Sequence, residues 1–296
     1  MRRTPLTIAF VSDPGMVLPS LRALDAALRH APGGLDVLML GVNLTPQMWG
    51  WVDQVAARHP HARVRSEVMP EAWLHGADSP QSFITSTSLG RMFVPRLTTG
   101  RVLYLDGDIM VTGDLSAAAN LDMKGHPLAG VRDFSVLKWM SQRKPHAALQ
   151  RQTAVMPTGA DMSDYVNAGV LLMDVDAIRA VPGLIEQMED VEAVKGYPAF
   201  DQDRINAIFQ NRITHLDPVW NASWGRVGLQ RKHQAGLSLQ GAQSRPLIVH
   251  FHGPHKPWKK LRLSSLSRNA RAVWQYRRDM AAFHRRYADI PDRLPQ

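Results

Sequence analysis

Leu6-Thr-Ile-Ala-Phe-Val11 and Leu35-Asp-Val-Leu-Met-Leu-Gly-Val42, with the segment between them, are the stretch that decides the fold of this chain. Both apolar runs have the length of buried strands. Between them, leucines recur at three- and four-residue spacing, which predicts a helix over residues 17–30. A strand, a helix and a second strand in this order predict a parallel βαβ unit, and such sheets bind ligands at the carboxyl ends of their strands.

The same alternation continues outward from this unit, so the chain as a whole is predicted to be of the α/β class. Further strands are predicted over residues 62–69, 168–175 and 247–251, with one more that starts at Arg101 and ends at an acidic pair, Asp106 and Asp108. Further helices are predicted over residues 46–58, 82–93, 176–194, 202–210 and 267–287. Residues 220–245 are polar and rich in Gly and Gln, which predicts loop and short strands.

Composition excludes several classes of protein. The 296 residues are 45% hydrophobic and 21% charged, which excludes a mainly disordered chain. There is no Cys, so disulfides, thiolate metal sites and a Cys nucleophile are excluded. No stretch approaches the roughly 20 apolar residues of a membrane helix, and no signal peptide is recognisable, so a cytoplasmic protein is expected.

The net charge of +9 is concentrated near the C-terminus, where eleven basic residues and three acidic residues lie from Lys256 onward. The helix predicted there has an apolar face formed by Val273, Tyr276, Met280, Phe283 and Tyr287. Such a basic amphipathic helix can lie on an anionic membrane, or it can dock on the domain with a solvated basic face. Since the rest of the chain is close to neutral and has no zinc-finger or RNA-recognition motif, no nucleic-acid partner is expected.

An acidic pair follows a predicted strand in Tyr104-Leu-Asp106-Gly-Asp108. Residues two apart in a strand point the same way, so both carboxylates can hold one hard cation such as Mg²⁺, Mn²⁺ or Ca²⁺. The alternative is a solvated turn at the end of a strand. His250 ends the last predicted strand, and a nitrogen ligand beside two carboxylates would favour Mn²⁺, whereas a structural histidine is the alternative.

Two further clusters have side chains that suit a sugar. Asn167-Ala-Gly169 begins a buried strand and offers an amide and a close backbone approach, although strand-start capping and packing explain it equally well. Asp201-Gln202-Asp203 precedes an apolar helix. Taken alone, this second cluster is better explained as a helix N-cap, with Asp201 as the cap and Asp203 favoured by the helix dipole.

Together, these segments resemble the retaining glycosyltransferases of family eight, which include bacterial lipopolysaccharide galactosyl- and glucosyltransferases and glycogenin. The resemblance extends over about residues 7–258. It rests on five places in order: Phe10-Val-Ser-Asp13, residues 88–91, Leu103-Tyr-Leu-Asp106-Gly-Asp108, Tyr165-Val-Asn-Ala-Gly-Val-Leu-Leu172 with Asp201-Gln-Asp203, and His250-x-x-Gly253-x-x-Lys256-Pro-Trp258.

The resemblance implies a single GT-A domain over residues 1–258 with a mainly parallel, Rossmann-like sheet flanked by helices, followed by a basic tail over residues 259–296. It also implies Mn²⁺ (or Mg²⁺) and a UDP-sugar donor, UDP-glucose or UDP-galactose. By position, the metal ligands would be Asp106, Asp108 and His250, the donor-binding residues would be Asp13, Arg91, Asp133, Asn167, Gly253 and Lys256, and the residues serving catalysis would be Gln202, Asp201 and Asp203. Relatives often have a Tyr that stacks on the base, whereas this chain has Met16.

The resemblance thus implies transfer of a hexose, with retention of configuration, to a saccharide or lipid-linked saccharide acceptor such as lipopolysaccharide. Front-face attack is expected, with Gln202 beside the sugar, because an amide is a poor nucleophile. Asp203 is the carboxylate that a covalent route would use. The basic tail would suit peripheral contact with the inner face of the membrane. The alternative function is a non-catalytic nucleotide-sugar or sugar-binding protein of the same fold.

Overall fold

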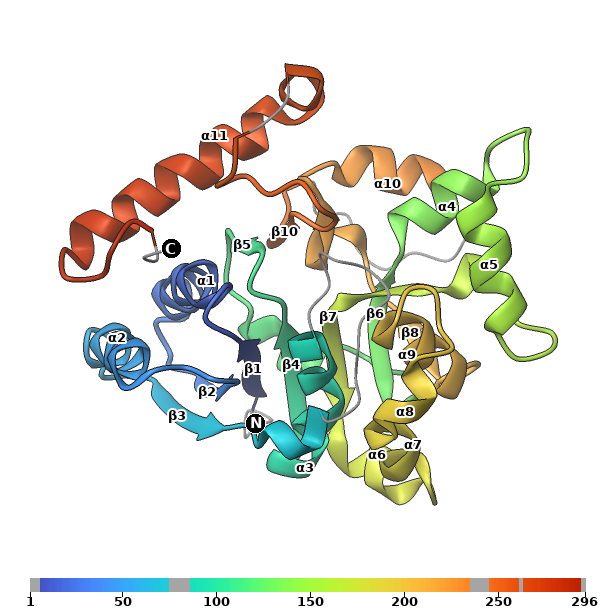
Figure 1. The fold of residues 1–296 in the computed structure, drawn as a ribbon, viewed down its shortest axis with the longest axis horizontal. Helices are drawn as coiled ribbons and strands as arrows, with labels where there is room; N and C mark the ends of the chain where they lie inside the picture. The colour runs from blue at the N-terminus through green and yellow to red at the C-terminus, as the bar shows by residue number, and fades with distance from the viewer. Residues whose placement is uncertain (1–5, 75–85, 235–244, 261–262, 294–296) are drawn as a thin grey trace.

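The computed structural model describes residues 6–74, 86–234, 245–260 and 263–293, with backbone alone for 86 and 263–268. A seven-stranded sheet runs through the centre of the molecule (Figure 1). Its strands, in spatial order, are β3 (Arg63–Val68), β2 (Asp36–Gly41), β1 (Leu6–Ser12), β4 (Arg101–Leu105), β7 (Val166–Asp174), β6 (Leu128–Arg132) and β8 (Ile213–His215).

Strand direction determines which residues meet at the edge of this sheet. Strands β3, β2, β1 and β4 are parallel, with Phe10 of β1 opposite both Met39 of β2 and Leu105 of β4. Strand β7 runs antiparallel to both β4 and β6, and β6 is parallel to β8. The beginning of β7 therefore lies at the same edge as the ends of β1, β4 and β6.

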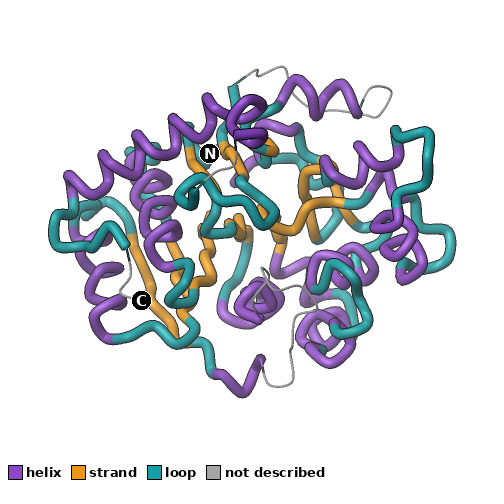
Figure 2. Tube along the Cα trace, turned by 45° about the horizontal axis from the view of Figure 1, so that its top comes forward, coloured by secondary structure: helices purple, strands orange, loops and turns teal. Residues whose placement is uncertain are grey.

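Helices cover both faces of the sheet, and the alternation of side chains explains how (Figure 2). Ile8 and Phe10 belong to a core with α1 (Val17–Arg29) and α2 (Pro46–Ala57). Ala9 and Val11, on the opposite face, belong to a core whose helices are α3 (Gly90–Leu97), α6 (Val175–Ala180), α7 (Leu184–Glu189), α8 (Val191–Val194) and α9 (Asp201–Ile208). Burying one such large apolar side chain contributes about 1.5–3 kcal/mol, so the two cores fix the sheet between them.

A second, three-stranded sheet lies next to the first. It consists of β5 (Ile109–Val111), β10 (Ile248–His250) and β9 (Ala222–Ser223), with β10 in the middle. Strands β10 and β5 are antiparallel, and His250 is opposite Ile109. Only Asp106, Gly107 and Asp108 separate β4 of the large sheet from β5 of the small one.

Several segments differ from the prediction. The helix predicted over residues 176–194 is three helices (α6, α7 and α8), because Gly183 adopts a left-handed conformation with φ of 74° and Asp190 caps a new helix. Of the helix predicted over residues 82–93, residues 82–85 lie outside the described residues, residues 86–89 form a 3₁₀ turn, and α3 extends to Leu97. The prediction of loop and short strands for residues 220–245 was right for β9 and wrong for α10 (Val227–His233), and residues 235–244 lie outside the described residues.

Two helices that the sequence did not predict, α4 (Phe134–Met140) and α5 (Ala147–Val155), follow β6 and form a hairpin at one end of the molecule (Figure 1). Helix α11 (Leu263–Arg286) lies along α1 on the opposite side, and described residues 287–293 follow it (Figures 1 and 2). No helix among the described residues is long and apolar enough to cross a membrane.

The apolar face predicted for the C-terminal helix packs on the rest of the chain. Tyr276, Phe283 and Val273 are buried, and the Arg22 guanidinium pairs with Asp279 at 2.6 Å. Of the aromatic side chains in this segment, Trp274 is 60% exposed. This arrangement is that of a docked helix, so the apolar face is not the surface available to a membrane.

Candidate functional site

The site forms where the strand ends of the large sheet meet. Asp13 directly follows β1, Asp106 follows β4, Asp133 follows β6, and Asn167 is the second residue of β7. All four side chains line one cavity of about 880 Å³. This volume is typical of a site for a small molecule or cofactor. The cavity therefore lies at the carboxyl edge that the βαβ pattern predicted.

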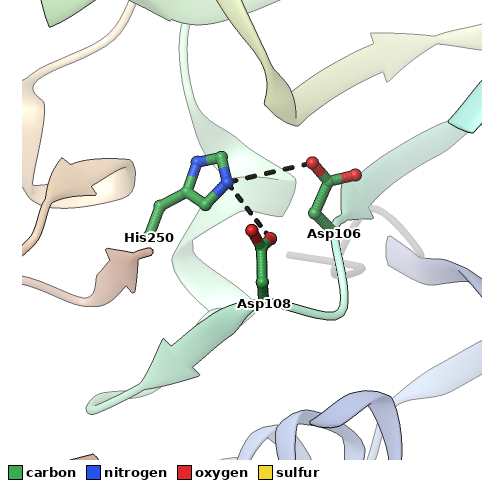
Figure 3. Close-up of side chains that lie close together, drawn as sticks. All are labelled: Asp106, Asp108 and His250. Carbon is green, nitrogen blue, oxygen red and sulfur yellow. Dashed lines mark ion pairs between the residues drawn. The ribbon is translucent and has the colours of Figure 1, made fainter. Parts of the chain in front are cut away.

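Asp106, Asp108 and His250 meet in this cavity (Figure 3). His250 Nε2 lies 3.2 Å from Asp108 Oδ1 and 3.8 Å from Asp106 Oδ2, and one ligand atom from each residue lies within 4.8 Å of the others. The reason for the convergence differs from the one expected. The two carboxylates are not on one strand, because the chain turns at Gly107, and the pairing of β10 with β5 brings the imidazole to Asp108.

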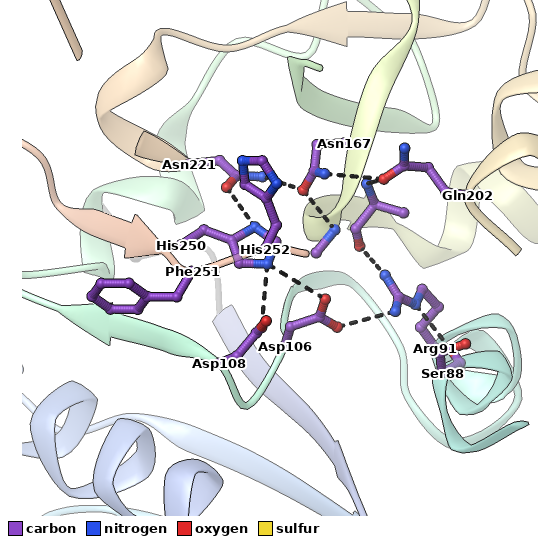
Figure 4. Close-up of polar contacts among 12 residues, drawn as sticks. Ser88, Arg91, Asp106, Asp108, Asn167, Gln202, Asn221, His250, Phe251 and His252 are labelled. Atoms are coloured by element: carbon purple, nitrogen blue, oxygen red, sulfur yellow. Dashed lines mark hydrogen bonds and ion pairs between the residues drawn. The ribbon is translucent and has the colours of Figure 1, made fainter. Parts of the chain in front are cut away.

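The imidazole of His250 is oriented by amides. Its Nδ1 lies 3.0 Å from Asn221 Oδ1, and Asn221 Nδ2 donates to Asn167 Oδ1 at 2.9 Å (Figure 4). Since Asn221 Oδ1 can only accept, Nδ1 carries the proton, and the lone pair of a neutral imidazole is on Nε2, toward the carboxylates. Three sets of lone pairs that face one another require a proton or a cation between them, so the donor set fits a divalent ion.

Gly169 of β7 makes this approach possible. A Cβ at this position would lie 2.2 Å from His250 Cε1 and 2.7 Å from Asp106 Oδ2. The imidazole and the carboxylate therefore occupy the space that any other residue at position 169 would fill. The close backbone approach predicted for Asn167-Ala-Gly169 is toward these two side chains.

Lys256 and Gly253 follow β10 and line the same cavity. Lys256 Nζ pairs with Asp108 Oδ2 and donates to the Phe251 carbonyl at 3.2 Å. Burial alone would raise the pKa of Asp108, but Lys256 and His250 hold it well below its usual value of 3.8. Gly253 has φ of 88°, a left-handed conformation that glycine adopts without strain.

Arg91 connects the acidic pair with α9. Its guanidinium lies 3.1 Å from Asp106 Oδ1 and 2.8 Å from Asp201 Oδ2, and it donates to the Ala168 carbonyl at 2.5 Å. Burial raises the pKa of Asp201, and Arg91 opposes the rise. The interpretation of Asp201 as the N-cap was wrong, because the capping position is Phe200 and Asp201 instead faces Arg91 in the cavity.

Gln202 is fixed by its neighbours. Its Oε1 accepts from Asn167 Nδ2 and from the Ala168 N–H, both at 3.0 Å. Asp133 Oδ2 also accepts from Asn167 Nδ2, while Asp133 Oδ1 caps α4 by accepting from the Ser135 and Val136 N–H groups. These bonds hold the Gln202 amide in one orientation at the cavity wall.

Asp203 does not line the cavity. It is fully buried, and its carboxylate accepts from Tyr165 Oη at 2.5 Å, from Gln152 Nε2 at 3.1 Å and from the Ala199 N–H at 2.5 Å. Its bonds join α9 to α5 and to Tyr165, the residue before β7. The structure thus separates Asp203 from the other predicted site residues.

Sequence reasoning missed Asn221 and gave His252 no role. Asn221 comes just before the two-residue strand β9, in a segment without periodicity, so its place beside His250 had no signal. His252 lines the cavity with Nε2 2.7 Å from Ser223 Oγ. Burial lowers the pKa of His252 to about 4, so this imidazole is neutral at pH 7.

Comparison with known proteins identifies similar chains. The family model described as glycosyl transferase family 8 matches residues 66–262, two thirds of the chain. Lipopolysaccharide 1,3-galactosyltransferase of Salmonella typhimurium is 28% identical over 54% of this chain and 44% of its own length. Glycosyltransferase GlyF of Streptococcus pneumoniae is 29% identical over 93% of this chain and 61% of its own length. The chain thus spans about half the length of these curated relatives.

A solved galactosyltransferase structure, LgtC in complex with donor and acceptor sugar analogues, superimposes with a TM-score of 0.66 at 20% identity, over 91% of this chain and 95% of that one. This similarity confirms the predicted fold class. The molecule has the GT-A type of α/β fold, with a mainly parallel sheet flanked by helices and a helix at the C-terminal end.

Proposed function

Since the chain belongs to glycosyl transferase family 8, we propose that it transfers a hexose from UDP-glucose or UDP-galactose to a saccharide acceptor, with retention of the anomeric configuration. The observation that carries the proposal is the convergence of Asp106, Asp108 and His250 in a cavity of about 880 Å³. We assign residues 1–258 to the catalytic domain and residues 259–296 to the tail.

Asp106, Asp108 and His250 would hold a divalent cation, Mn²⁺ or Mg²⁺. The fit rests on the donor set described above and on the space left by Gly169. When bound, such an ion neutralises charge that develops on a departing diphosphate. The nitrogen ligand favours Mn²⁺ over Mg²⁺.

Different residues of the cavity would bind the diphosphate, the uracil and the hexose of the donor. Lys256 supplies a point charge for the diphosphate, and Gly253 lets the backbone approach it. Asp13 and Met16, which line the cavity between β1 and α1, would contact the uracil. The hexose would contact the residues at the β7 and β6 end of the site, which are Arg91, Asp133, Asn167, Asp201 and Gln202.

Front-face attack is the route that the geometry supports. The leaving phosphate oxygen would take the proton of the acceptor hydroxyl as the glycosidic bond forms and the bond to UDP breaks. An amide oxygen is a poor nucleophile, and Gln202 Oε1 is weaker still because it already accepts two hydrogen bonds. Asp203, the carboxylate of the covalent route, does not line the cavity. Gln202 would steady the positively charged sugar in the transition state.

The acceptor class follows from the named relatives. The Salmonella relative is a lipopolysaccharide 1,3-galactosyltransferase, and a lipid-linked or lipopolysaccharide acceptor is therefore proposed here too. Such an acceptor would place the enzyme in the cytoplasm, at the inner face of the membrane.

Metal-dependent UDP release from a panel of nucleotide sugars tests the proposal. A chelator should abolish UDP release, and Mn²⁺ should restore it in the wild type but not in Asp108→Asn. Asp176→Asn, an exposed aspartate outside the cavity, is the control and should behave as the wild type. Full rescue of Asp108→Asn by Mn²⁺ would contradict the cation role. A wild type that binds UDP but releases none from any donor would instead be the non-catalytic binding protein.

A further inference from the structure

The hairpin of α4 and α5 has an unusual charge. Residues 134–160 contain Lys138, Arg143, Lys144 and Arg151, and no Asp or Glu. This concentration of positive charge is separate from that of the tail, because the hairpin lies at the opposite end of the molecule from α11 (Figure 1). A local field of one sign attracts ligands of the other.

The order of the strands places this hairpin at the acceptor end of the cavity. Along the edge β1, β4, β7, β6, the side chains are Asp13, Asp106, Asn167 and Asp133. With the proposed function, these positions correspond to the nucleoside, the diphosphate and the hexose in turn. Beyond the hexose, the cavity is walled by α4, α5 and residues 195–199, so this is where an acceptor enters.

Two cations line this end, Arg151 of α5 and Lys195. Lys195 pairs with Glu192 at 2.7 Å on the surface. Arg151 is exposed, and its guanidinium has no ion-pair or hydrogen-bond partner within the described parts of the chain. Elsewhere in the cavity, Asp108 pairs with Lys256, and Asp106 and Asp201 share Arg91. Asp133 accepts from Asn167 and from the N–H groups at the start of α4. The residues of α4, α5 and 195–199 that line the cavity include no Asp or Glu, so the uncompensated charge on this wall is positive.

Arg151 is held on a fixed backbone. Ala148, Arg151 and Gln152 are three and four residues apart and line the cavity from one face of α5. Gln152 is buried and donates to Asp203 Oδ1 at 3.1 Å and to Tyr165 Oη at 3.3 Å. Trp139 of α4, which also lines the cavity, stacks on His146 with 4.4 Å between ring centroids. The wall thus combines an apolar aromatic surface with a guanidinium whose backbone is anchored.

We propose that the acceptor is a saccharide that carries a phosphate or carboxylate group, and that Arg151 binds this group. The inference rests on the proposed function for the meaning of the acceptor end. A guanidinium binds a phosphate or carboxylate through two parallel N–H···O bonds, and it stays charged at every physiological pH. The sugar of the acceptor would lie against Trp139 with its anionic group toward Arg151.

Binding and transfer with charged and neutral sugars test this inference. The probes are glucose 1-phosphate, glucose 6-phosphate, glucuronate and glucose, offered in the presence of UDP or a UDP-sugar. In the wild type, at least one charged probe should bind with a lower Kd than glucose and should accept the transferred hexose with a lower KM. Arg151→Gln should raise the Kd and KM for that probe about tenfold, leave glucose unchanged, and leave acceptor-independent UDP release unchanged.

Arg143→Gln is the matched control, because Arg143 is an exposed arginine of the same hairpin that does not line the cavity. It should leave the Kd and KM for every probe unchanged. Equal use of charged and neutral sugars by the wild type would overturn the inference, as would an equal effect of Arg143→Gln and Arg151→Gln. Direct binding of the probes decides this without turnover, whereas absence of UDP release from every donor counts against the proposed function alone.

Discussion

His250 shows how a single side chain of this site is determined by residues far away in the sequence. Asn221 accepts from its Nδ1, Asn167 accepts from Asn221, and Asn167 in turn donates to Asp133 and Gln202. This series of hydrogen bonds connects the His250 imidazole at one end of the site with the Gln202 amide at the other. Partners that orient a ligating histidine typically change metal affinity 10–100-fold when they are replaced.

Gly169→Ala should damage the site more than the fold. The new Cβ would require His250 and Asp106 to move, because it would lie 2.2 Å from the imidazole and 2.7 Å from the carboxylate. We expect UDP release to fall by a factor of about 100 and the free energy of unfolding to fall by about 1–3 kcal/mol. Activity assays and denaturant titration measure the two effects.

Gly228→Ala in α10 is the control for this substitution. Its Cβ would meet no atom within 4 Å, and helical alanine is more stable than glycine by about 1 kcal/mol. Its activity should equal that of the wild type. A Gly169→Ala enzyme with wild-type activity would show that His250 and Asp106 do not need their present positions.

Single residues were predictable where chemistry follows a strong local pattern. Asp106, Asp108 and His250 come next to apolar strands, so the ends of those strands predicted the place of their side chains. Asn221 has no such pattern, and its role follows from the pairing of β9 with β10, which is invisible in a single sequence. Asp203 was predicted at the site because it is adjacent in sequence to Asp201 and Gln202. Those two residues face the cavity, whereas Asp203 bonds to Gln152 and Tyr165.

At the level of elements, α9 carries two side chains with opposite tasks. Gln202 faces the cavity, whereas Asp203 is turned into the protein. Gln202→Ala should lower kcat about 100-fold, since it removes an oriented dipole beside the sugar, and should cost only about 1 kcal/mol of stability from the hydrogen bonds lost at the cavity wall. Asp203→Asn should lower the free energy of unfolding by about 2 kcal/mol, because it impairs buried hydrogen bonds, and should preserve kcat.

Measurement of kcat on the folded fraction, with unfolding curves for both variants, separates these tasks. The reverse result, in which Gln202→Ala keeps nearly full turnover and folded Asp203→Asn has none, would favour a covalent intermediate on a carboxylate.

Elements were predictable in the N-terminal half and less so after β4. Strands β1, β2 and β3 alternate with helices whose apolar spacing is regular, and all were found. Strands β6 and β8 have five and three residues, too few for a periodicity to emerge. Helix α10 is largely polar, and it packs on α4 and β9 rather than over the large sheet, so its sequence resembles a loop.

At the scale of the whole molecule, Asp25 connects the tail with the domain. Its carboxylate accepts from Tyr287 Oη at 2.8 Å and from Arg29 at 2.9 Å, and it pairs with Arg286. Burial would raise the pKa of Asp25, but the bonds from Arg29, Tyr287 and His59 lower it below 3.8. A lowered folded-state pKa means that this stabilisation is fully present above pH 3.8 and is lost as the pH falls through the folded-state pKa.

Asp25→Asn should therefore be less stable than the wild type by about 3 kcal/mol at neutral pH, with the difference shrinking below pH 3.8. Urea unfolding of both proteins between pH 7 and pH 3 measures the difference. A difference that stays constant over the whole range would show that the carboxylate charge is not what holds the tail.

The outer face of α11 is the part of the tail that is available for membrane contact. Trp274 is exposed there, with Arg278 above its ring, and Arg271 and Arg285 are exposed as well. Replacing the three arginines by Gln and Trp274 by Ser should weaken binding to vesicles of anionic lipid about 100-fold, because each arginine contributes roughly 1 kcal/mol near such a surface.

Co-sedimentation at low and high salt measures this effect. Arg63, Arg212 and Arg245, exposed elsewhere, serve as a charge-matched control when changed to Gln. Equal vesicle binding by both variants would remove the tail from the membrane hypothesis. Removal of residues after Trp258 is a poorer test, since it would uncover the core that Tyr276 and Phe283 complete.

The Asp106-Gly107-Asp108 turn connects β4 of the large sheet with β5 of the small sheet, and it also carries both carboxylates of the site. Slippage of β5 against β10 by one residue would carry Asp108 away from His250, since the register of that pair fixes both. The acidic cluster therefore assembles only when β5 and β10 pair in the correct register. A newly made chain can assemble this cluster only after β10 has paired with β5, some 140 residues earlier in the sequence, so residue 250 must be synthesised before any catalysis can begin.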